Sequence, residues 1–444
     1  MNKNVGEAIR KCMDCLGGVF AHEDCRKILL YIVSIKFIID NKKIPLTNEN
    51  FDVFLDAQRM LDKAELDKDI ITTLNYVIEN HFGIGSGSLT EFSNFYFRVV
   101  ELKKSQKINI VEELKSVTFE NESDAVISSL KTVLRNHATS FGRMMSNEIS
   151  TQSISELIRE LIALENDEKF ADFTYGLGLS SLEITKEVNC RLEGYDINKQ
   201  TSTMAQMLLI VAGKENFKIY NEDITTVNIT VNSVDKIATI PPFGMKVRDL
   251  ELGGAYLLQE FGLPVKPCNL EVLIALQGIK SLKENGKMIL AVTPNMLFSA
   301  TTVEKKFREL MTQSYLSAVI TLPSLYYGTN IATNLIILEK NRKLDQITFI
   351  DASSNEHFTF ANKDKKSQNE LTDGAINKIS EIIRESETIK GISYCCSTDE
   401  IEENYFSLVP SRYVQTKRKR ETLSNSEIDK RLQHLYAEIN QMTN

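Results

Sequence analysis

Residues 235–244, reading Asp-Lys-Ile-Ala-Thr-Ile-Pro-Pro-Phe-Gly, combine a short β-branched run with an abrupt stop. Proline cannot continue a central strand, and it restricts the preceding residue to an extended conformation. The segment therefore predicts a buried strand that ends in a rigid lip made of Ile240, Pro241, Pro242 and Phe243. Ligands of open α/β sheets bind at the carboxyl ends of strands, where this lip would lie. An ordinary strand–loop boundary fits the decapeptide equally well, so the neighbouring segments must decide.

A second candidate site comes earlier, in the stretch Asp172-Phe-Thr-Tyr-Gly176-Leu-Gly178. It follows an apolar run and precedes a helical pattern. Glycines in such a turn let the backbone approach a ligand at the helix N-terminus. One Gly-x-Gly is weak evidence, because a tight turn without any ligand gives the same pattern.

Acidic residues end the next two expected strands. Asp196 closes Gly194-Tyr-Asp, about 20 residues beyond the glycine turn, where an acid binds ribose hydroxyls. Asp223 closes Asn-Glu-Asp after the third strand. Four consecutive strand ends therefore carry polar or special residues. Because parallel strands end at one edge of a sheet, this ordered series predicts a ligand site there and is more specific than any one member.

The segments that must position these residues alternate between strand and helix from Ser153 onward. Such alternation predicts a mostly parallel sheet covered on both faces, with an antiparallel edge strand permitted near its end. The expected strands are Phe170–Phe173, Arg191–Ile197, Phe217–Asn221, Lys236–Ile240, Met288–Thr293, Ser317–Leu322 and Asn334–Glu339. The expected intervening helices are Ser180–Val188, Lys199–Ala212, Leu270–Glu284 and Thr302–Gln313.

Both ends of the chain differ from this middle part. Residues 1–145 show apolar residues at helical spacing and no alternating strand pattern, which predicts a helical N-terminal domain. Residues 146–355 would be the α/β domain, and residues 356–444 a C-terminal extension without sheet character. The extension carries a basic run at 417–420 and ends in an amphipathic helix over Ser424–Met442. A terminal helix of this kind docks on a partner or packs back on its own core.

The bulk composition narrows the class of protein. The chain has 444 residues, 42% hydrophobic and 25% charged, which is typical of a multidomain globular protein. Its net charge of −8 argues against a surface that is basic throughout but allows a local basic groove. No apolar run is long enough to span a bilayer and no signal peptide is evident, so a cytoplasmic protein without a membrane partner is expected.

The cysteine pattern favours a reducing compartment, since seven cysteines without regular spacing do not form a disulfide framework. Cys12, Cys15, His22 and Cys25 could suggest zinc. A single helix covers the first two and no second closing pair follows, so no metal site is expected.

The site motifs and the rest of the chain together resemble the modification (methyltransferase) subunit of type I restriction–modification systems, which are γ-type DNA adenine-N6 methyltransferases. The resemblance covers most of the chain. It includes Ser281–Pro294, Ala318–Pro323 with Gly328, Phe349–Ser353 and Leu408–Tyr413. It implies a Rossmann-like, seven-stranded S-adenosylmethionine-dependent methyltransferase domain behind a helical N-terminal domain and before a helical tail. It also implies DNA and a separate specificity-type subunit, bound through the C-terminal helix, as partners. A second copy or a paralogous methyltransferase subunit fits as well.

The cofactor motifs of this family match in part. In its Asp-Pro-x-Cys-Gly-x-Gly motif, Asp172, Gly176 and Gly178 are retained, while Tyr175 and Leu177 are bulkier than usual. They are expected to crowd the methionine end of the cofactor. The resemblance implies that Asp196 binds the ribose hydroxyls of the cofactor and that Asp223 accepts a hydrogen bond from its adenine amino group. Of the family's Phe-Tyr-Thr-Pro element only Thr151 remains, followed by Gln152. S-adenosylmethionine binding is therefore expected to be weak or lost.

The catalytic motif departs most at its first position. The family has Asn-Pro-Pro-Phe or Asn-Pro-Pro-Tyr, in which the Asn side chain and a proline carbonyl accept hydrogens from the adenine amino group and the aromatic ring stacks on the flipped base. Ile240 stands in the place of this Asn and has no side-chain acceptor. Losing one preorganised polar contact costs about 3–4 kcal/mol, or ~10²–10³ in rate.

Three functions compete on these grounds. The favoured one is a catalytically degenerate methyltransferase subunit that acts as a DNA-binding or scaffold component of a restriction-type or defence complex. The second is an active adenine-N6 methyltransferase that uses a backbone carbonyl at Ile240. The third, a nucleotide-dependent oxidoreductase, leaves the Pro-Pro-Phe lip without a role. If the cofactor side is also altered, Ile240→Asn alone is not expected to restore transfer.

Overall fold

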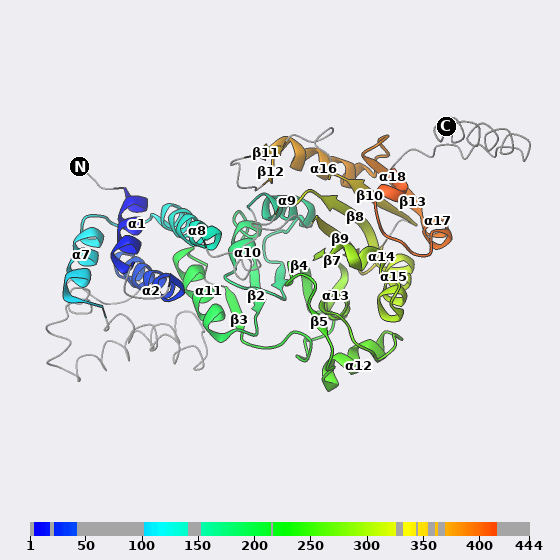
Figure 1. The fold of residues 1–444 in the computed structure, drawn as a ribbon, viewed down its shortest axis with the longest axis horizontal. Helices are drawn as coiled ribbons and strands as arrows, with labels where there is room; N and C mark the ends of the chain where they lie inside the picture. The colour runs from blue at the N-terminus through cyan, green and yellow to red at the C-terminus, as the bar shows by residue number, and fades with distance from the viewer. Residues whose placement is uncertain are drawn as a thin grey trace, which may run out of the picture.

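The computed structural model describes residues 4–17, 22–41, 102–140, 152–214, 216–325, 332–342, 345–353, 360–362 and 369–414. Helices gather at one end of the molecule and a large twisted sheet, covered by helices, makes up the rest (Figure 1). Within these described ranges, no helix combines the length and the apolar character that crossing a bilayer requires.

The N-terminal part is helical wherever the structure describes it, as the sequence predicts. Its helices are α1 (Val5–Leu16), α2 (His22–Asp40), α7 (Lys104–Lys115) and α8 (Ser123–Ser140). Asn4 begins α1 as an N-cap, since its side chain accepts a hydrogen bond from the Gly6 amide at 2.8 Å. Residues 42–101 of this expected helical domain lie outside the described residues.

The sheet has nine strands in the order β13-β10-β8-β9-β7-β4-β1-β2-β3. All seven predicted strands are present and adjacent to one another, which confirms the seven-stranded methyltransferase-like core. Seven of the nine strands run parallel to one another, and β9 and β13 run antiparallel to them. The strands are β1 (Lys169–Asp172), β2 (Arg191–Tyr195), β3 (Phe217–Tyr220), β4 (Val234–Thr239), β7 (Leu282–Val292), β8 (Leu316–Leu322), β9 (Thr333–Glu339), β10 (Gln346–Asp351) and β13 (Ser393–Ser397).

Two expectations about the end of the sheet are wrong. The antiparallel strand β9 is not at the edge but lies between β7 and β8. Its residues are buried along nearly their whole length, which an edge position would not allow. The chain beyond Asp351 also keeps sheet character, because β13 pairs antiparallel with β10. The segment Ser-Tyr-Cys-Cys-Ser of β13 shows no apolar alternation that could have predicted it.

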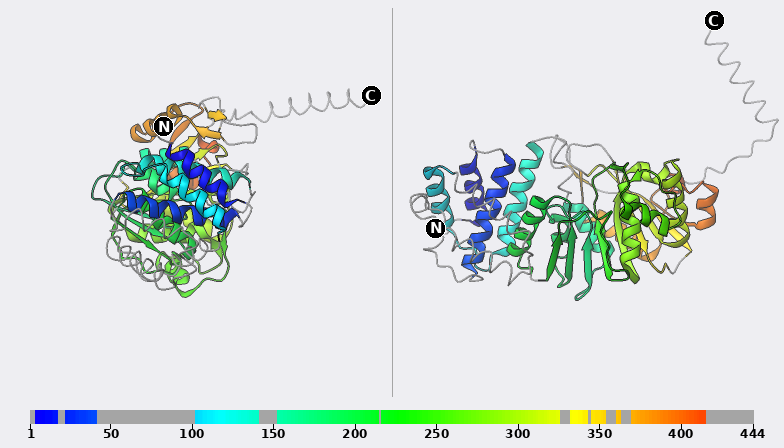
Figure 2. Two further views of the ribbon diagram at one scale, coloured as in Figure 1. Left: turned by 90° about the vertical axis from the view of Figure 1, so that its left-hand side faces the viewer. Right: turned by 90° about the horizontal axis from the view of Figure 1, so that it is seen from below.

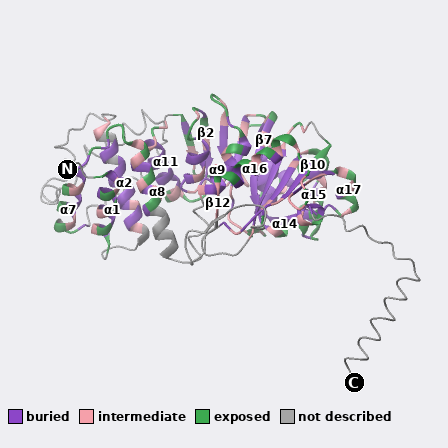
Figure 3. Cartoon of the chain, turned by 90° about the horizontal axis from the view of Figure 1, so that it is seen from above, coloured by how far each residue is buried: buried purple, intermediate pink, exposed green. Residues whose placement is uncertain are grey.

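Helices cover both faces of the sheet. On one face, α9 (Gln152–Ile162), α10 (Leu179–Ile184), α11 (Lys199–Val211) and α16 (Asp373–Glu385) share one apolar core with the N-terminal helices. On the other face a second core includes α13 (Leu270–Ser281), α15 (Thr302–Ser314), α17 (Thr398–Glu403) and α18 (Ser411–Val414). Figure 2 shows the N-terminal helices stacked beside the sheet, and Figure 3 shows that most strand residues are buried. The sheet is therefore a rigid base for the loops at its edges.

Smaller elements complete the fold. The segment between β4 and α13 contains β5 (Lys246–Val247), α12 (Leu252–Glu260) and β6 (Cys268–Asn269). The short helix α14 (Pro294–Phe298) follows β7. Strands β11 (Phe360–Asn362) and β12 (Asn369–Leu371) form a separate pair. Only the first of these segments reaches the site that is described next.

Candidate functional site

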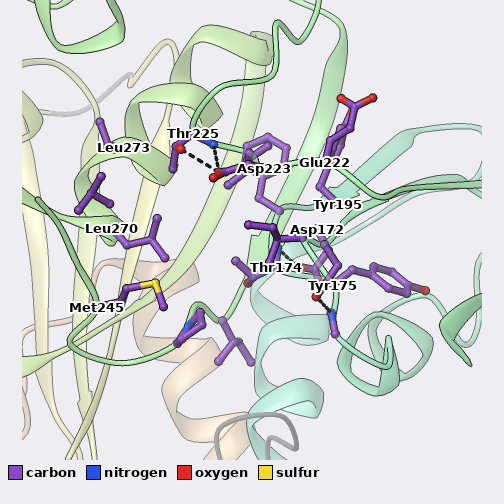
Figure 4. A pocket seen from close by; sticks show the side chains of 18 of the residues that line it. Asp172, Thr174, Tyr175, Tyr195, Glu222, Asp223, Thr225, Met245, Leu270 and Leu273 are labelled. Atoms are coloured by element: carbon purple, nitrogen blue, oxygen red, sulfur yellow. Dashed lines mark hydrogen bonds between the residues drawn. The ribbon is translucent and has the colours of Figure 1, made fainter. Parts of the chain in front are cut away.

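One pocket of about 340 Å³ opens at the carboxyl edge of the sheet, beyond β1, β2, β3 and β4 (Figure 4). Most of the residues that the sequence singles out meet in it, although they are far apart in the chain. These lining residues are Asp172, Gly176, Gly178, Asp196, Asp223, Ile240 and Pro242. Pro241 and Phe243 do not line it, and Thr151 lies outside the described residues.

Asp172 ends β1 and is buried at the base of this pocket. Its Oδ2 accepts a hydrogen bond from Ser181 Oγ at 2.7 Å, and its Oδ1 accepts one from the Thr174 amide at 3.1 Å. Burial outweighs these hydrogen bonds and raises the pKa of the carboxyl to about 6. Asp172 therefore ties the glycine turn to the first turn of α10 and carries a charge that is costly to keep.

Asp196 follows β2 and holds the glycine turn from the other side. Its Oδ2 accepts a hydrogen bond from the Gly176 amide at 2.9 Å, and its Oδ1 accepts one from the Asn198 amide at 2.7 Å. Partial burial raises the pKa of this carboxyl in spite of both hydrogen bonds. Each oxygen has a further lone pair for a ligand hydroxyl. The predicted ribose acid is thus in a position to act as one.

The glycines of the turn have a structural role besides any ligand. A Cβ atom at Gly178 would lie 2.2 Å from Tyr175 Cε1, and one at Gly194 would lie 2.4 Å from Tyr175 Cδ2. The Tyr175 ring packs over both glycines inside the apolar core, and its hydroxyl has no hydrogen-bond partner among the described residues. Leu177 is also buried in this core and does not line the pocket. Leu177 therefore lies away from the pocket, whereas Tyr175, although buried, lines it, so crowding of the ligand by Tyr175 stays a prediction.

Asp223 follows β3 and is half-buried at the pocket wall. Both hydrogen bonds that the described residues donate to its side chain, from the amide and the hydroxyl of Thr225, end on Oδ1 at 2.8 and 2.7 Å. Oδ2 is thus available to a ligand amino group. Figure 4 shows Asp223 and Thr225 across the pocket from Thr174 and Tyr175.

The lip begins one residue after β4 ends at Thr239. Ile240 and Pro242 are half-buried and line the pocket, whereas Pro241 is buried. A hydrogen bond of 2.7 Å between the hydroxyls of Thr239 and Thr174 connects the lip to the glycine turn. Phe243 is half-buried and packs against the apolar core. The expected base-stacking ring is therefore beside the pocket rather than in its wall.

Some wall residues were not predicted from the sequence. The segment between β4 and α13 closes one side of the pocket with Met245, Val247, Leu250 and Gly254. A Cβ at Gly253 would lie 2.8 Å from the Cα of Thr226, so this glycine lets α12 approach the loop after Asp223. The Gly-Gly pair at 253–254 inside a helical pattern was the signal that could have indicated this contact.

The electrostatics of the pocket are one-sided. The lining includes six acidic residues and, within the described chain, no Lys, Arg or His. A cavity of this composition favours a ligand with cationic groups, because carboxylates that gather in a cleft attract positive charge. The acidic lining residues are Asp172, Asp196, Glu222, Asp223, Asp249 and Glu251.

Comparisons with known proteins agree with this geometry. The sequence profile of the N-6 DNA Methylase family matches residues 123–422. The type I restriction enzyme MpnII methylase subunit of Mycoplasma pneumoniae is 24% identical over 413 residues, which are 84% of this chain and 75% of that protein.

Solved structures show the same fold. The methyltransferase subunit of the type I restriction–modification system of Streptococcus thermophilus superimposes with a TM-score of 0.72 at 20% identity, covering 93% of this chain and 99% of that one. A chain from a study of complex assembly and conformational transition in the type I system gives 0.63 at 14% identity, covering 100% and 97%. These two likenesses concern the fold, and the profile match extends over more than half of the chain. The chain belongs to the N-6 DNA methylase family.

Proposed function

We propose that this chain is the modification-type subunit of a type I restriction–modification or related defence complex, and that it binds S-adenosylmethionine but transfers methyl groups to adenine poorly or not at all. Its main contribution would then be DNA binding and scaffolding. The observation that carries this proposal is Ile240, which lines the pocket at the place where the family has an acceptor side chain.

The pocket residues suit the cofactor. S-adenosylmethionine, when bound, supplies an electrophilic methyl group on a positively charged sulfur. The acidic lining fits that charge, and Asp196 has lone pairs for two ribose hydroxyls. Asp223 Oδ2 can accept a hydrogen bond from the adenine amino group, while Ile197 and Ile224 add apolar lining to the pocket. Because the Thr151–Gln152 element departs from the family motif, we expect micromolar rather than nanomolar affinity for S-adenosylmethionine.

The lip determines how well the amino group of the target adenine can react. The lone pair of this amino group is conjugated with the adenine ring, and it becomes nucleophilic when hydrogen-bond acceptors draw the amino hydrogens out of the ring plane. The backbone carbonyl groups of the lip can provide one acceptor, but the side chain of Ile240 provides none. Removing one preorganised contact of this kind lowers the rate by ~10²–10³.

An active enzyme is the second candidate. The favouring observation is that the lip itself is intact, because Pro242 lines the pocket and the Thr239–Thr174 hydrogen bond holds its base. In this case the backbone carbonyl at Ile240 would replace the missing side-chain acceptor. Partners are the same in both proposals: DNA and a specificity-type subunit, with a second methyltransferase-type chain in the assembly.

The deciding experiment compares the wild type with Ile240→Asn and Ile240→Leu, each assembled with its specificity-type subunit. Calorimetric titration with S-adenosylmethionine should give similar micromolar affinities for all three. Transfer of labelled methyl groups to DNA should be near background for the wild type and for Ile240→Leu.

Ile240→Asn should raise transfer by up to ~10²–10³. The sequence predicts no rescue, because Tyr175, Leu177 and Gln152 alter the cofactor side. Of these, Leu177 is buried in the core and does not line the pocket, whereas Tyr175 does, so we propose a partial rescue. Robust transfer by the wild type would refute the degenerate-enzyme proposal in favour of the active one.

A further inference from the structure

The segment over residues 243–269, between β4 and α13, has two different sides. Its β5 and β6, which are joined by the connection that contains α12, form a short antiparallel pair that we call the hairpin. Lys246 is paired to Asn269 and Val247 to Cys268. Met245 and Val247 line the pocket. In Figure 1 the following helix α12 lies below the sheet, and it packs against α13 of one sheet face. This hairpin is thus a wall of the pocket and, at the same time, part of the outer surface beside its opening.

The other side of the hairpin is basic. In an extended segment the neighbours of an inward-facing residue point to the opposite face. Because Val247 faces the pocket, Lys246 and Arg248 face away from it, and both are exposed. Neither forms an ion pair within the part of the chain that the structure describes. Their charges are therefore available to a partner.

The contrast with the pocket indicates what that partner is. Six carboxylates line the pocket and would repel a phosphodiester backbone, while a neutral base can enter. A nucleic acid that delivers a base to the lip must keep its phosphates outside this acidic lining. Lys246 and Arg248 are exposed cations next to lining residues of the hairpin, and phosphates are the anions that Lys and Arg hold on DNA.

We propose that Lys246 and Arg248 hold the phosphate backbone of DNA on the outer face of the β5–β6 hairpin, beside the pocket into which the target base turns. This inference rests on the proposed function, since it assigns the DNA contacts of the same site. The two cations act as sequence-independent anchors: they set the position of the strand and do not read its bases.

The test measures the salt dependence of DNA binding by the assembled complex, using fluorescence anisotropy of an end-labelled duplex of mixed sequence. The variant is Lys246→Gln with Arg248→Gln. The control is Arg384→Gln with Lys390→Gln, which removes the same two charges near the end of α16. Figures 1 and 2 place α16 on the opposite side of the molecule from α12. All four side chains are exposed, so both double variants should fold.

Each lost phosphate contact lowers the slope of log K against log salt by about 0.9. The hairpin variant should therefore show a slope smaller by about 1.8, and its affinity at low salt should fall about tenfold while S-adenosylmethionine binding is unchanged. The control should match the wild type. Equal slopes for the hairpin variant and the wild type would overturn this inference and leave the proposed function standing. A wild-type complex that binds no DNA would overturn both.

Discussion

Asp172 is the one buried acid among those that line the pocket, and its burial makes the stability of the fold depend on pH. In the folded protein its pKa is about 6, whereas an unfolded aspartate titrates near pH 4. Between these values the folded state binds more protons than the unfolded state. The free energy of unfolding therefore falls as the pH rises through this window. The largest contribution that this shift allows is about 3 kcal/mol.

Asp172→Asn should remove that contribution. Urea unfolding at about pH 4 and about pH 7 should show that the variant loses less stability over this range than the wild type, by up to about 3 kcal/mol. Ser181→Ala should have the opposite effect. It removes the hydrogen bond to Asp172 Oδ2 that lowers the pKa of this carboxyl, so this variant should lose more stability over the same pH range than the wild type. The wild type and Asp172→Asn would respond identically to pH if the carboxyl were not buried as described.

Tyr175 and Gly194 give a second prediction at the scale of single residues. A methyl group at Gly194 would overlap the Tyr175 ring, with a closest contact of 2.4 Å. Gly194→Ala should therefore lower the free energy of unfolding by about 1–3 kcal/mol through overpacking. In a Tyr175→Cys background the same substitution should cost less, because the ring is gone and only the end of the flexible Ile219 side chain, with Cδ1 at 2.7 Å, stays close. A double-mutant cycle by urea unfolding measures this coupling, and strictly additive effects would contradict the packing.

At the scale of elements, the sequence predicted well what depends on local pattern. All seven predicted strands are present, because strong apolar periodicity and turn residues specify them. The four strand ends meet at one pocket because parallel strands end at one edge. The inserted position of β9, the strand β13 and the wall over residues 243–269 depend on long-range packing, for which the local pattern carries no signal.

The place of β13 changes how the chain can be divided. The expected boundary between residues 355 and 356 would cut the sheet, since β13 follows it and pairs with β10. Phe349 on β10 stacks on Tyr413 with the ring centroids 4.3 Å apart. The buried Arg308 guanidinium donates to the carbonyl oxygens of Phe406 and Ser299 at 2.8 Å each. Residues 369–414 thus pack as part of the α/β domain.

Truncation tests this revised boundary. A chain that ends at residue 353 should unfold at a much lower temperature than the full chain, because Phe349 and Arg308 lose their partners and β10 becomes an exposed edge. A chain that ends at residue 420 should keep the melting temperature of the full chain. Thermal unfolding followed by circular dichroism compares the three. A stable chain 1–353 would restore the sequence-based boundary.

At the scale of the whole molecule, the distribution of charge says more than its sum. The net charge of −8 alone argues against a nucleic-acid protein. Six acids and no Lys, Arg or His of the described residues line the pocket, while the exposed Lys246 and Arg248 lie on the segment beside it. A further basic run at 417–420 comes soon after the last described residue, Val414. An acidic protein can therefore present local basic surface to DNA, and such surface cannot be read from the total.

Assembly with a partner subunit depends in our proposal on the C-terminal helix predicted over Ser424–Met442, which lies outside the described residues. Its apolar stripe includes Leu432 and Ile439, one heptad apart. Deleting residues 421–444 should leave the melting temperature unchanged, because the described core ends at Val414, and should abolish the complex with the specificity-type subunit.

A pair of matched point variants separates the stripe from the helix as a whole. Leu432→Glu with Ile439→Glu places two charges in the stripe and should abolish the complex. Gln433→Glu with Asn440→Glu adds the same charges at the same spacing on the neighbouring polar positions and should assemble like the wild type. Size-exclusion chromatography with light scattering measures the assembly, and thermal unfolding of each free subunit checks the fold. If the truncated chain assembled normally but melted at a lower temperature, the stripe would pack on its own domain, and the docking surface for the specificity-type subunit would have to lie elsewhere.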